Sequence, residues 1–162
     1  MIESNVITEM VADLFPQAHL RPQGSPADAA LKAAKMRGFI EVWNSKVQGS
    51  IFAPFFGPGD KDATTKMVNG LKNDVVPLLK EFSGPFVLGN QFSMAEAMTA
   101  SFVLRLWAYA NAGFYGEGFY EQLEGIKEAK DWHDAIEERH SIKKTWNEKD
   151  NVDAMRKRIE SK

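Results

Sequence analysis

Residues 93–110 read Ser-Met-Ala-Glu-Ala-Met-Thr-Ala-Ser-Phe-Val-Leu-Arg-Leu-Trp-Ala-Tyr-Ala, and this stretch decides the fold. Its first four residues, from Ser93 to Glu96, have the pattern of a capping box. In such a box the serine hydroxyl accepts a hydrogen bond from the backbone N–H three residues on, and the glutamate carboxylate accepts one from the serine N–H. The helix that follows is apolar nearly all round. A helix of that kind belongs at the centre of a helical bundle.

The segments on either side have helical periodicity. No run of alternating apolar and polar residues is long enough to form a credible sheet. Pro16 predicts the end of the first helix, and Pro77 lies inside the third helical pattern, where it predicts a kink or break. Asp60 is a candidate N-cap for that third helix. We therefore predict an all-α helical bundle, with further helices over residues 7–14, about 25–51, about 60–82, 117–124, 127–138 and 151–160.

The second helix has a strong start signal and an unusual apolar pattern. Ser25 can cap it, Pro26 suits its first position, and Asp28 favours the positive end of the helix dipole. Because its apolar residues lie on two sides, we expect it to have two neighbours. One stripe passes through Leu31, Ala34, Gly38 and Val42, and the other through Met36, Ile40, Trp43 and Val47, with Phe39 between them.

Composition excludes several classes of function. The chain has 162 residues, no cysteine, and 20 Lys and Arg against 22 Asp and Glu, for a net charge of −2. Disulfides, thiol nucleophiles and zinc fingers are therefore impossible within it, and a general nucleic-acid binder would need a basic excess. Its longest apolar stretch, residues 94–110, is too polar and too short to span a bilayer, and residues 1–10 lack the pattern of a secretory signal. We expect a cytoplasmic protein that binds neither membranes nor nucleic acids.

Three motifs resemble the glutathione S-transferase family, and they occur in that family's order. Residues 3–16 (ESNVITEMVADLFP) are similar to the Glu-Ser motif that opens the last helix of the family's thioredoxin-like, glutathione-binding domain. Residues 89–97 (GNQFSMAEA) resemble the capped central helix of its C-terminal domain, with Glu96 where Asp is usual. Trp132 and residues 138–145 (ERHSIKKT) resemble the segment after the penultimate helix, with His140 where proline is common. The resemblance covers almost the whole chain.

The resemblance implies a division of the chain and a function. Residues 1–16 would be the last helix of a thioredoxin-like domain, residues 17–24 a linker, and residues 25–162 the helical C-terminal domain. The implied activity is transfer of the glutathione thiol to an electrophilic small molecule, a detoxification reaction, with glutathione as co-substrate and no other cofactor. Glu3 and Ser4 would contact glutathione. No catalytic residue is expected here, because the family's thiol-activating residue lies in the region that the chain lacks.

Other candidate residues have structural readings as well as functional ones. Met36, Phe39 and Trp43 could wall the pocket for the hydrophobic co-substrate, although aromatic residues at helical spacing also suit a core. Arg105 interrupts the most apolar helix, so it either pairs with a carboxylate such as Glu96 or points into a ligand cleft. His133 and His140 are seven residues apart, too few ligands for a metal site.

Two further expectations concern the protein as a whole. An alternative to the enzyme is a non-catalytic helical interaction module of the same fold, as occurs in translation factors and tRNA synthetases. A homodimer is expected for two reasons. The second helix has more apolar surface than one neighbour covers, and a chain without the thioredoxin-like domain exposes the apolar face that this domain would cover.

Overall fold

The structure, a computed structural model, describes residues 4–56 and 62–161. The described residues form helices and no β-strand, apart from two isolated bridges between residues 86 and 91. This confirms the predicted all-α fold. The helices are α1 (Ser4–Leu14), α2 (Pro26–Trp43), α3 (Gly49–Phe52), α4 (Ala63–Gly70), α5 (Val76–Leu79), α6 (Met94–Asn111), α7 (Phe119–Glu124), α8 (Lys127–Glu137), α9 (His140–Lys143) and α10 (Glu148–Glu160), with a 3-10 turn at Pro16–Ala18 and π turns at Asn44–Gln48 and Leu71–Val75.

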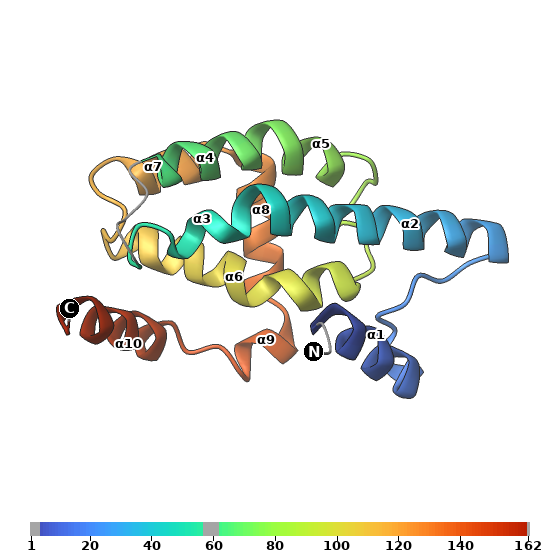
Figure 1. The fold of residues 1–162 in the computed structure, drawn as a ribbon. Coiled ribbons are helices and arrows are strands. Elements are labelled where there is room, and N and C mark those ends of the chain that lie inside the picture. The colour runs from blue at the N-terminus through green and yellow to red at the C-terminus, as the bar shows by residue number, and fades with distance from the viewer. Residues whose placement is uncertain (1–3, 57–61, 162) are drawn as a thin grey trace.

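Helix α6 lies at the centre of the bundle, as predicted, and contacts α1, α2, α7, α8 and α10 (Figure 1). Its capping box is present: Ser93 Oγ accepts from the Ala95 N–H at 3.2 Å, and Glu96 Oε2 accepts from the Ser93 N–H at 2.8 Å. Both capping side chains are fully buried. The second oxygen of Glu96 accepts from the Val87 N–H at 2.7 Å and from Trp132 Nε1 at 3.3 Å. One buried carboxylate therefore joins the start of α6 to the preceding loop and to α8.

The second helical segment begins and ends close to where the sequence predicts. Ser25 caps α2 by accepting from the Asp28 N–H at 3.3 Å, and helical structure continues through a π turn and α3 to Phe52. Only one of its two apolar stripes is buried. The other stripe has no covering neighbour among the described residues, since Leu31 is 58% exposed and Ala34 and Gly38 are also exposed. The N-terminal part of α2 extends beyond the other helices of the bundle (Figure 1).

The third helical segment runs from α4 to α5 without a break. Pro77, expected to interrupt it, is the second residue of α5 and follows the π turn at Leu71–Val75. A π turn moves the preceding carbonyl groups out of regular α register, which relieves their clash with the proline ring. Gly70 lets this segment approach α2's extension closely, because a Cβ there would lie 2.7 Å from the Lys46 carbonyl oxygen. The candidate cap Asp60 lies outside the described residues.

The C-terminal helices close the bundle. Helices α7 and α8 match the predicted segments, α10 begins three residues earlier than predicted, and the short α9 was not predicted. Asn147 caps α10 by accepting from the Asp150 N–H at 3.2 Å. Among the residues described, no helix is both long and apolar enough to cross a membrane.

Candidate functional site

One of the two predicted glutathione contacts lies at the start of α1. Ser4 is the first residue of that helix, whereas Glu3 lies outside the described residues. The free backbone N–H groups of a helix start favour an anionic ligand such as a carboxylate. This placement is compatible with the expected role of Ser4, which stays a prediction.

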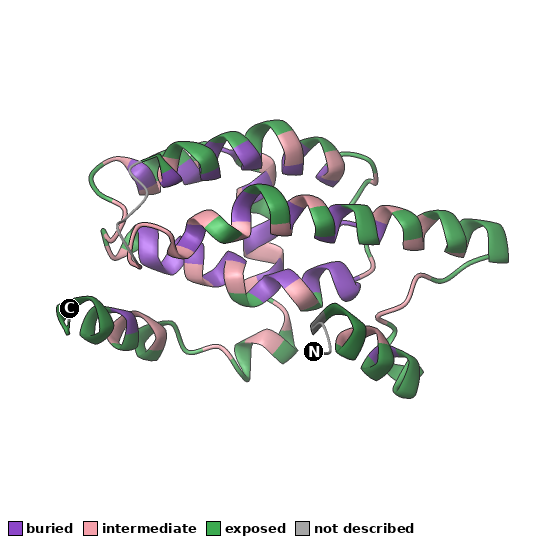
Figure 2. Ribbon diagram, viewed as in Figure 1, coloured by how far each residue is buried: buried purple, intermediate pink, exposed green. Residues whose placement is uncertain are grey.

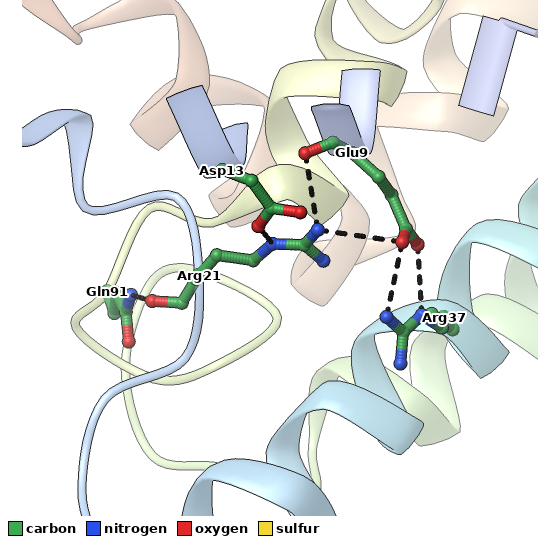
Figure 3. Close-up of polar contacts among 5 residues, drawn as sticks. All are labelled: Glu9, Asp13, Arg21, Arg37 and Gln91. Atoms are coloured by element: carbon green, nitrogen blue, oxygen red, sulfur yellow. Dashed lines mark hydrogen bonds and ion pairs between the residues drawn. The ribbon is translucent and has the colours of Figure 1, made fainter. Parts of the chain in front are cut away.

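A network of ion pairs attaches α1 to the bundle (Figure 3). Glu9 accepts from Arg37 of α2 through both carboxylate oxygens, at 2.9 and 3.2 Å. Arg21, in the connection between α1 and α2, donates to Asp13 at 2.9 Å and to the Glu9 carbonyl oxygen at 3.2 Å. Gln91, just before α6, donates to the Arg21 carbonyl oxygen at 2.7 Å. The orientation of α1 is thus set by contacts to two other parts of the chain.

The charges in this network favour the ionised forms of its members. Hydrogen bonds from Arg37 lower the pKa of Glu9 below its ordinary value, the charges of Arg37 and Arg21 act in the same direction, and burial opposes them. The same pair raises the pKa of Arg37. Since the Glu9 side chain is one-third exposed, water weakens the attraction, and the network positions α1 more than it stabilises the fold.

A cavity of about 390 Å³ lies beside the start of α1. Its lining residues are half apolar or small and half polar or charged, and the Glu9–Arg37 pair is among them. Its lining comes from α1, α2 and the beginning of α6, and consists of Asn5, Glu9, Arg37, Gly38, Ile40, Glu41, Met94 and Met98. Sequence reasoning missed this cavity, because contacts among three distant segments create it.

Helix α1 exposes an apolar surface, which Figure 2 shows as a mostly green helix. Ala12 is its one buried hydrophobic residue among those described. Adjacent large apolar side chains remain 42–64% exposed, namely Val6, Ile7, Met10, Val11, Leu14 and Phe15. An apolar surface of this extent marks a site of contact with another domain or chain.

The predicted co-substrate residues of α2 lie in the core. Met36, Phe39 and Trp43 are at most 1% exposed, and the rings of Phe39 and Trp43 contact Trp132 edge to face at 5.3 and 5.6 Å. The indole Nε1 of Trp43 is buried without a hydrogen-bond partner among the described residues. Core packing accounts for these three side chains as they stand, and their contact with a co-substrate stays a prediction.

Arg105 does not pair with Glu96, so that suggested partner was wrong. The Glu96 carboxylate is turned toward α8 and the preceding loop, whereas Arg105 donates to the Ser101 carbonyl oxygen at 2.9 Å and lies over the Trp146 ring at 5.9 Å. Arg105 is also a neighbour of Tyr109, whose pKa burial raises against the effect of the guanidinium. The side chain is only partly buried, so it avoids the cost of an enclosed unpaired charge.

An aromatic cluster next to Arg105 was not predicted. The rings of Phe55 and Tyr115 lie 5.2 Å apart, Phe52 contacts Phe102 and Tyr109, and Tyr115 donates to the Ile51 carbonyl oxygen at 2.9 Å. Helix α10 covers part of this cluster through Met155. The paired aromatic residues at positions 55–56 and 114–115 were the available signal.

Among known proteins, only solved structures match this chain; family models and curated sequences do not. Glutathione transferase Omega 1C from Trametes versicolor superimposes with a TM-score of 0.77 and 26% identity, over 98% of this chain and 66% of that one. Omega 2S from the same fungus, solved with 2,4-dihydroxybenzophenone, gives 0.74 and 26% over 96% and 67%. Omega 3C shares the fold, with a TM-score of 0.66 and 20% identity.

The share of each chain that is covered shows which part of the matched structures this chain resembles. The chain spans about two thirds of the length of each structure, and nearly all of its own residues are included. The described helices and the capped start of α6 agree with the fold that the resemblance found in the sequence implies. The chain therefore has the fold of the C-terminal helical domain of glutathione transferases.

Proposed function

We propose that the chain is the C-terminal part of a glutathione transferase, which transfers the glutathione thiol to an electrophilic small molecule. The observation that carries the proposal is the match to glutathione transferase Omega 1C over 98% of the chain. In the proposed reaction the glutathione sulfur bonds to the electrophilic carbon, the leaving group departs with its electron pair, and the thiol proton passes to solvent. A thioredoxin-like domain would supply the residue that stabilises the thiolate.

The exposed surface of α1 supports the proposed domain arrangement. Its six exposed apolar residues, from Val6 to Phe15, are the surface that a thioredoxin-like domain would cover if α1 were that domain's last helix. The Glu9–Arg37 pair would then hold the two domains in a fixed relation. A fixed relation matters for catalysis, because small displacements of bound reactants cost rate.

The binding residues follow from this arrangement. We assign the γ-glutamyl end of glutathione to Glu3 and Ser4, because helix N–H groups at the start of α1 favour a carboxylate. The hydrophobic co-substrate is assigned to Met36, Phe39 and Trp43 of α2 and to Arg105 of α6. Detoxification of such electrophiles would be the biological role.

Association and location complete the proposal. A homodimer is supported by the exposed Leu31 and the protruding end of α2, which two-fold pairing would cover. Sedimentation equilibrium tests it, since a dimer of this 18.2 kDa chain has a mass of about 36 kDa at micromolar concentration. A single species near the monomer mass at all concentrations would contradict it.

A cytoplasmic location suits an enzyme that needs glutathione in its thiol form.

The test uses the protein encoded by the full reading frame, including any sequence before Met1. It should conjugate glutathione to a chloronitrobenzene, and Ser4→Ala should raise the KM for glutathione about tenfold with little change in kcat. Ser25→Ala removes a serine from a different helix start and serves as the control. Absence of both conjugation and glutathione binding would refute the enzyme and leave the interaction module as the explanation.

A further inference from the structure

A second cavity, of about 230 Å³, lies between α6, α7, α8 and the start of α10. None of the residues assigned to glutathione or to its co-substrate borders it. Its volume is below the ~300–1,000 Å³ typical of sites for drug-sized ligands, so its occupant would be small. Its wall combines apolar surface from Leu104 and Trp107 with several ionisable side chains.

His133 is held rigidly in this wall. It is 8% exposed, its ring stacks on Trp107 with centroids 4.7 Å apart and planes 17° apart, and its Nδ1 lies 3.0 Å from an oxygen of Asp134. The other oxygen of Asp134 accepts from Lys130 at 2.6 Å. In a neutral ring that carries its proton on Nδ1, beside this carboxylate, Nε2 is a hydrogen-bond acceptor.

That acceptor is available to a ligand. Nε2 of His133 has no hydrogen-bond partner among the described residues, and it is not one of their fully enclosed unpaired polar atoms. His133 borders the cavity, so its ring forms part of the wall there. A nearly buried imidazole with one nitrogen anchored and the other free can therefore bind a donor in this cavity.

The carboxylates around the cavity fall into two groups. Glu124 accepts from Trp107 Nε1 at 3.1 Å and lies 3.6 Å from Lys130, which also pairs with Asp134, so these two charges are compensated. Glu137 and Glu148 have no ion-pair or hydrogen-bond partner in the part of the chain that the structure describes. The unpaired carboxylates at the cavity are thus those of Glu137 and Glu148, and the Tyr120 hydroxyl, the Asn111 amide and the Trp146 indole also border it.

Tyr120 gives independent support for this charge distribution. Burial raises the pKa of its hydroxyl, and the nearby carboxylates of Glu124, Glu148 and Asp134 raise it further, with Lys130 opposing. The field at the cavity is therefore negative. A negative field together with unpaired acceptors favours a ligand that brings positive charge and N–H donors.

We propose that this cavity binds a small aliphatic polyamine, whose ammonium groups donate to Glu137, Glu148 and His133 Nε2 while its carbon chain packs on Leu104, Trp107 and Tyr120. Free ammonium groups on one flexible chain match both the separated acceptors and the apolar wall. This site is independent of the glutathione proposal, and its test does not depend on transferase activity.

The experiment titrates the 162-residue chain with spermidine at low ionic strength, by calorimetry and by NMR of the imidazole signals. The chain contains three histidines, and the exposed His19 and His140 serve as internal controls. We expect saturable binding that shifts the His133 signals alone. Glu137→Gln and Glu148→Gln should each weaken binding about fivefold, because both carboxylates are solvent-accessible and unpaired. Glu160→Gln, the same charge change at the end of α10, should leave the affinity unchanged.

Two further ligands sharpen the test. Neutral 1,8-octanediol should not bind, and N-acetyl-lysine amide, which represents a lysine side chain of a partner protein, should bind at least about tenfold more weakly than spermidine. Equal binding of either compound would overturn the polyamine assignment. Parallel shifts of all three histidines, no saturation, or an unchanged affinity in the Glu137→Gln, Glu148→Gln double variant would overturn the site itself.

Discussion

Replacing Ser93 by alanine tests how much the buried N-terminal cap of the central helix α6 contributes to stability. The Ser93 hydroxyl makes two hydrogen bonds in a fully buried setting, one accepted from the Ala95 N–H at 3.2 Å and one donated to Glu96 Oε2 at 2.9 Å. Alanine removes both. It leaves the Ala95 N–H without its side-chain acceptor and the Glu96 carboxylate with three of its four donors.

The size of the effect follows from burial. An exposed N-cap serine is worth about 1 kcal/mol. Loss of a buried partner adds part of the desolvation cost of the group left behind, about 1–3 kcal/mol for a fully unsatisfied one. Since Glu96 keeps three donors, we expect Ser93→Ala to lower the free energy of unfolding by about 2 kcal/mol, or the melting temperature by about 4–8 °C for a domain of this size. Glu96→Gln should cost more, about 3 kcal/mol, because its amide NH₂ would face two N–H or O–H donors.

Urea unfolding followed by circular dichroism measures these changes, with Ser25→Ala as the matched control. Ser25 caps α2 through the same kind of contact, but at the surface, so its loss should cost about 0.5–1 kcal/mol. The urea m-value should stay constant, as for a change in stability alone. The reasoning fails if Ser93→Ala costs no more than Ser25→Ala.

Three other perturbations test the packing and the charge network. Gly70→Ala should destabilise the chain by about 1–3 kcal/mol, since the new Cβ would lie 2.7 Å from a backbone oxygen. Gly38→Ala should stabilise it by about 0.5–1 kcal/mol, because a Cβ there would have no neighbour within 4 Å. Equal effects of the two variants in urea unfolding would contradict this contrast. Trp132→Phe should lower stability by about 2 kcal/mol through loss of ring contacts and of the Nε1 bond to Glu96, and a melting temperature within error of the parent would refute that. Glu9, whose pKa is lowered in the folded state, contributes stability that is present above its unfolded pKa and lost as pH falls through the folded one. The unfolding midpoints of the parent and of Glu9→Gln should therefore differ at about pH 6 and converge below about pH 4, and a constant difference would be the contrary result.

The fold was readable from the sequence where local chemistry agrees with packing. The Ser93–Glu96 box and the Ser25-Pro26 start are signals complete within one helical turn, and both helices begin where predicted. Pro77 shows the limit of such reasoning, since a π turn, which local propensity does not reveal, keeps the helix continuous around it. The two apolar stripes of α2 mark a similar limit, because periodicity shows that a face is apolar but not whether a neighbour within the chain buries it.

The candidate site was less readable, because it depends on contacts between distant segments. The family motif located Ser4 at a helix start, yet nothing in the sequence indicated that Glu9 would pair with Arg37, 28 residues away. Arg105 was recognised as needing an explanation, but the choice of Glu96 as its partner ignored which side of α6 each residue occupies. The cavity around His133 likewise arises only when α6, α7, α8 and α10 come together.

The most direct test of the central claim is a calorimetric titration of glutathione into the protein expressed from its full reading frame. If the chain is the helical domain of a glutathione transferase, glutathione binds saturably at one site per subunit, and Ser4→Ala weakens it about tenfold while Ser25→Ala does not. A full-length protein that is folded and helical but takes up no glutathione would contradict the claim.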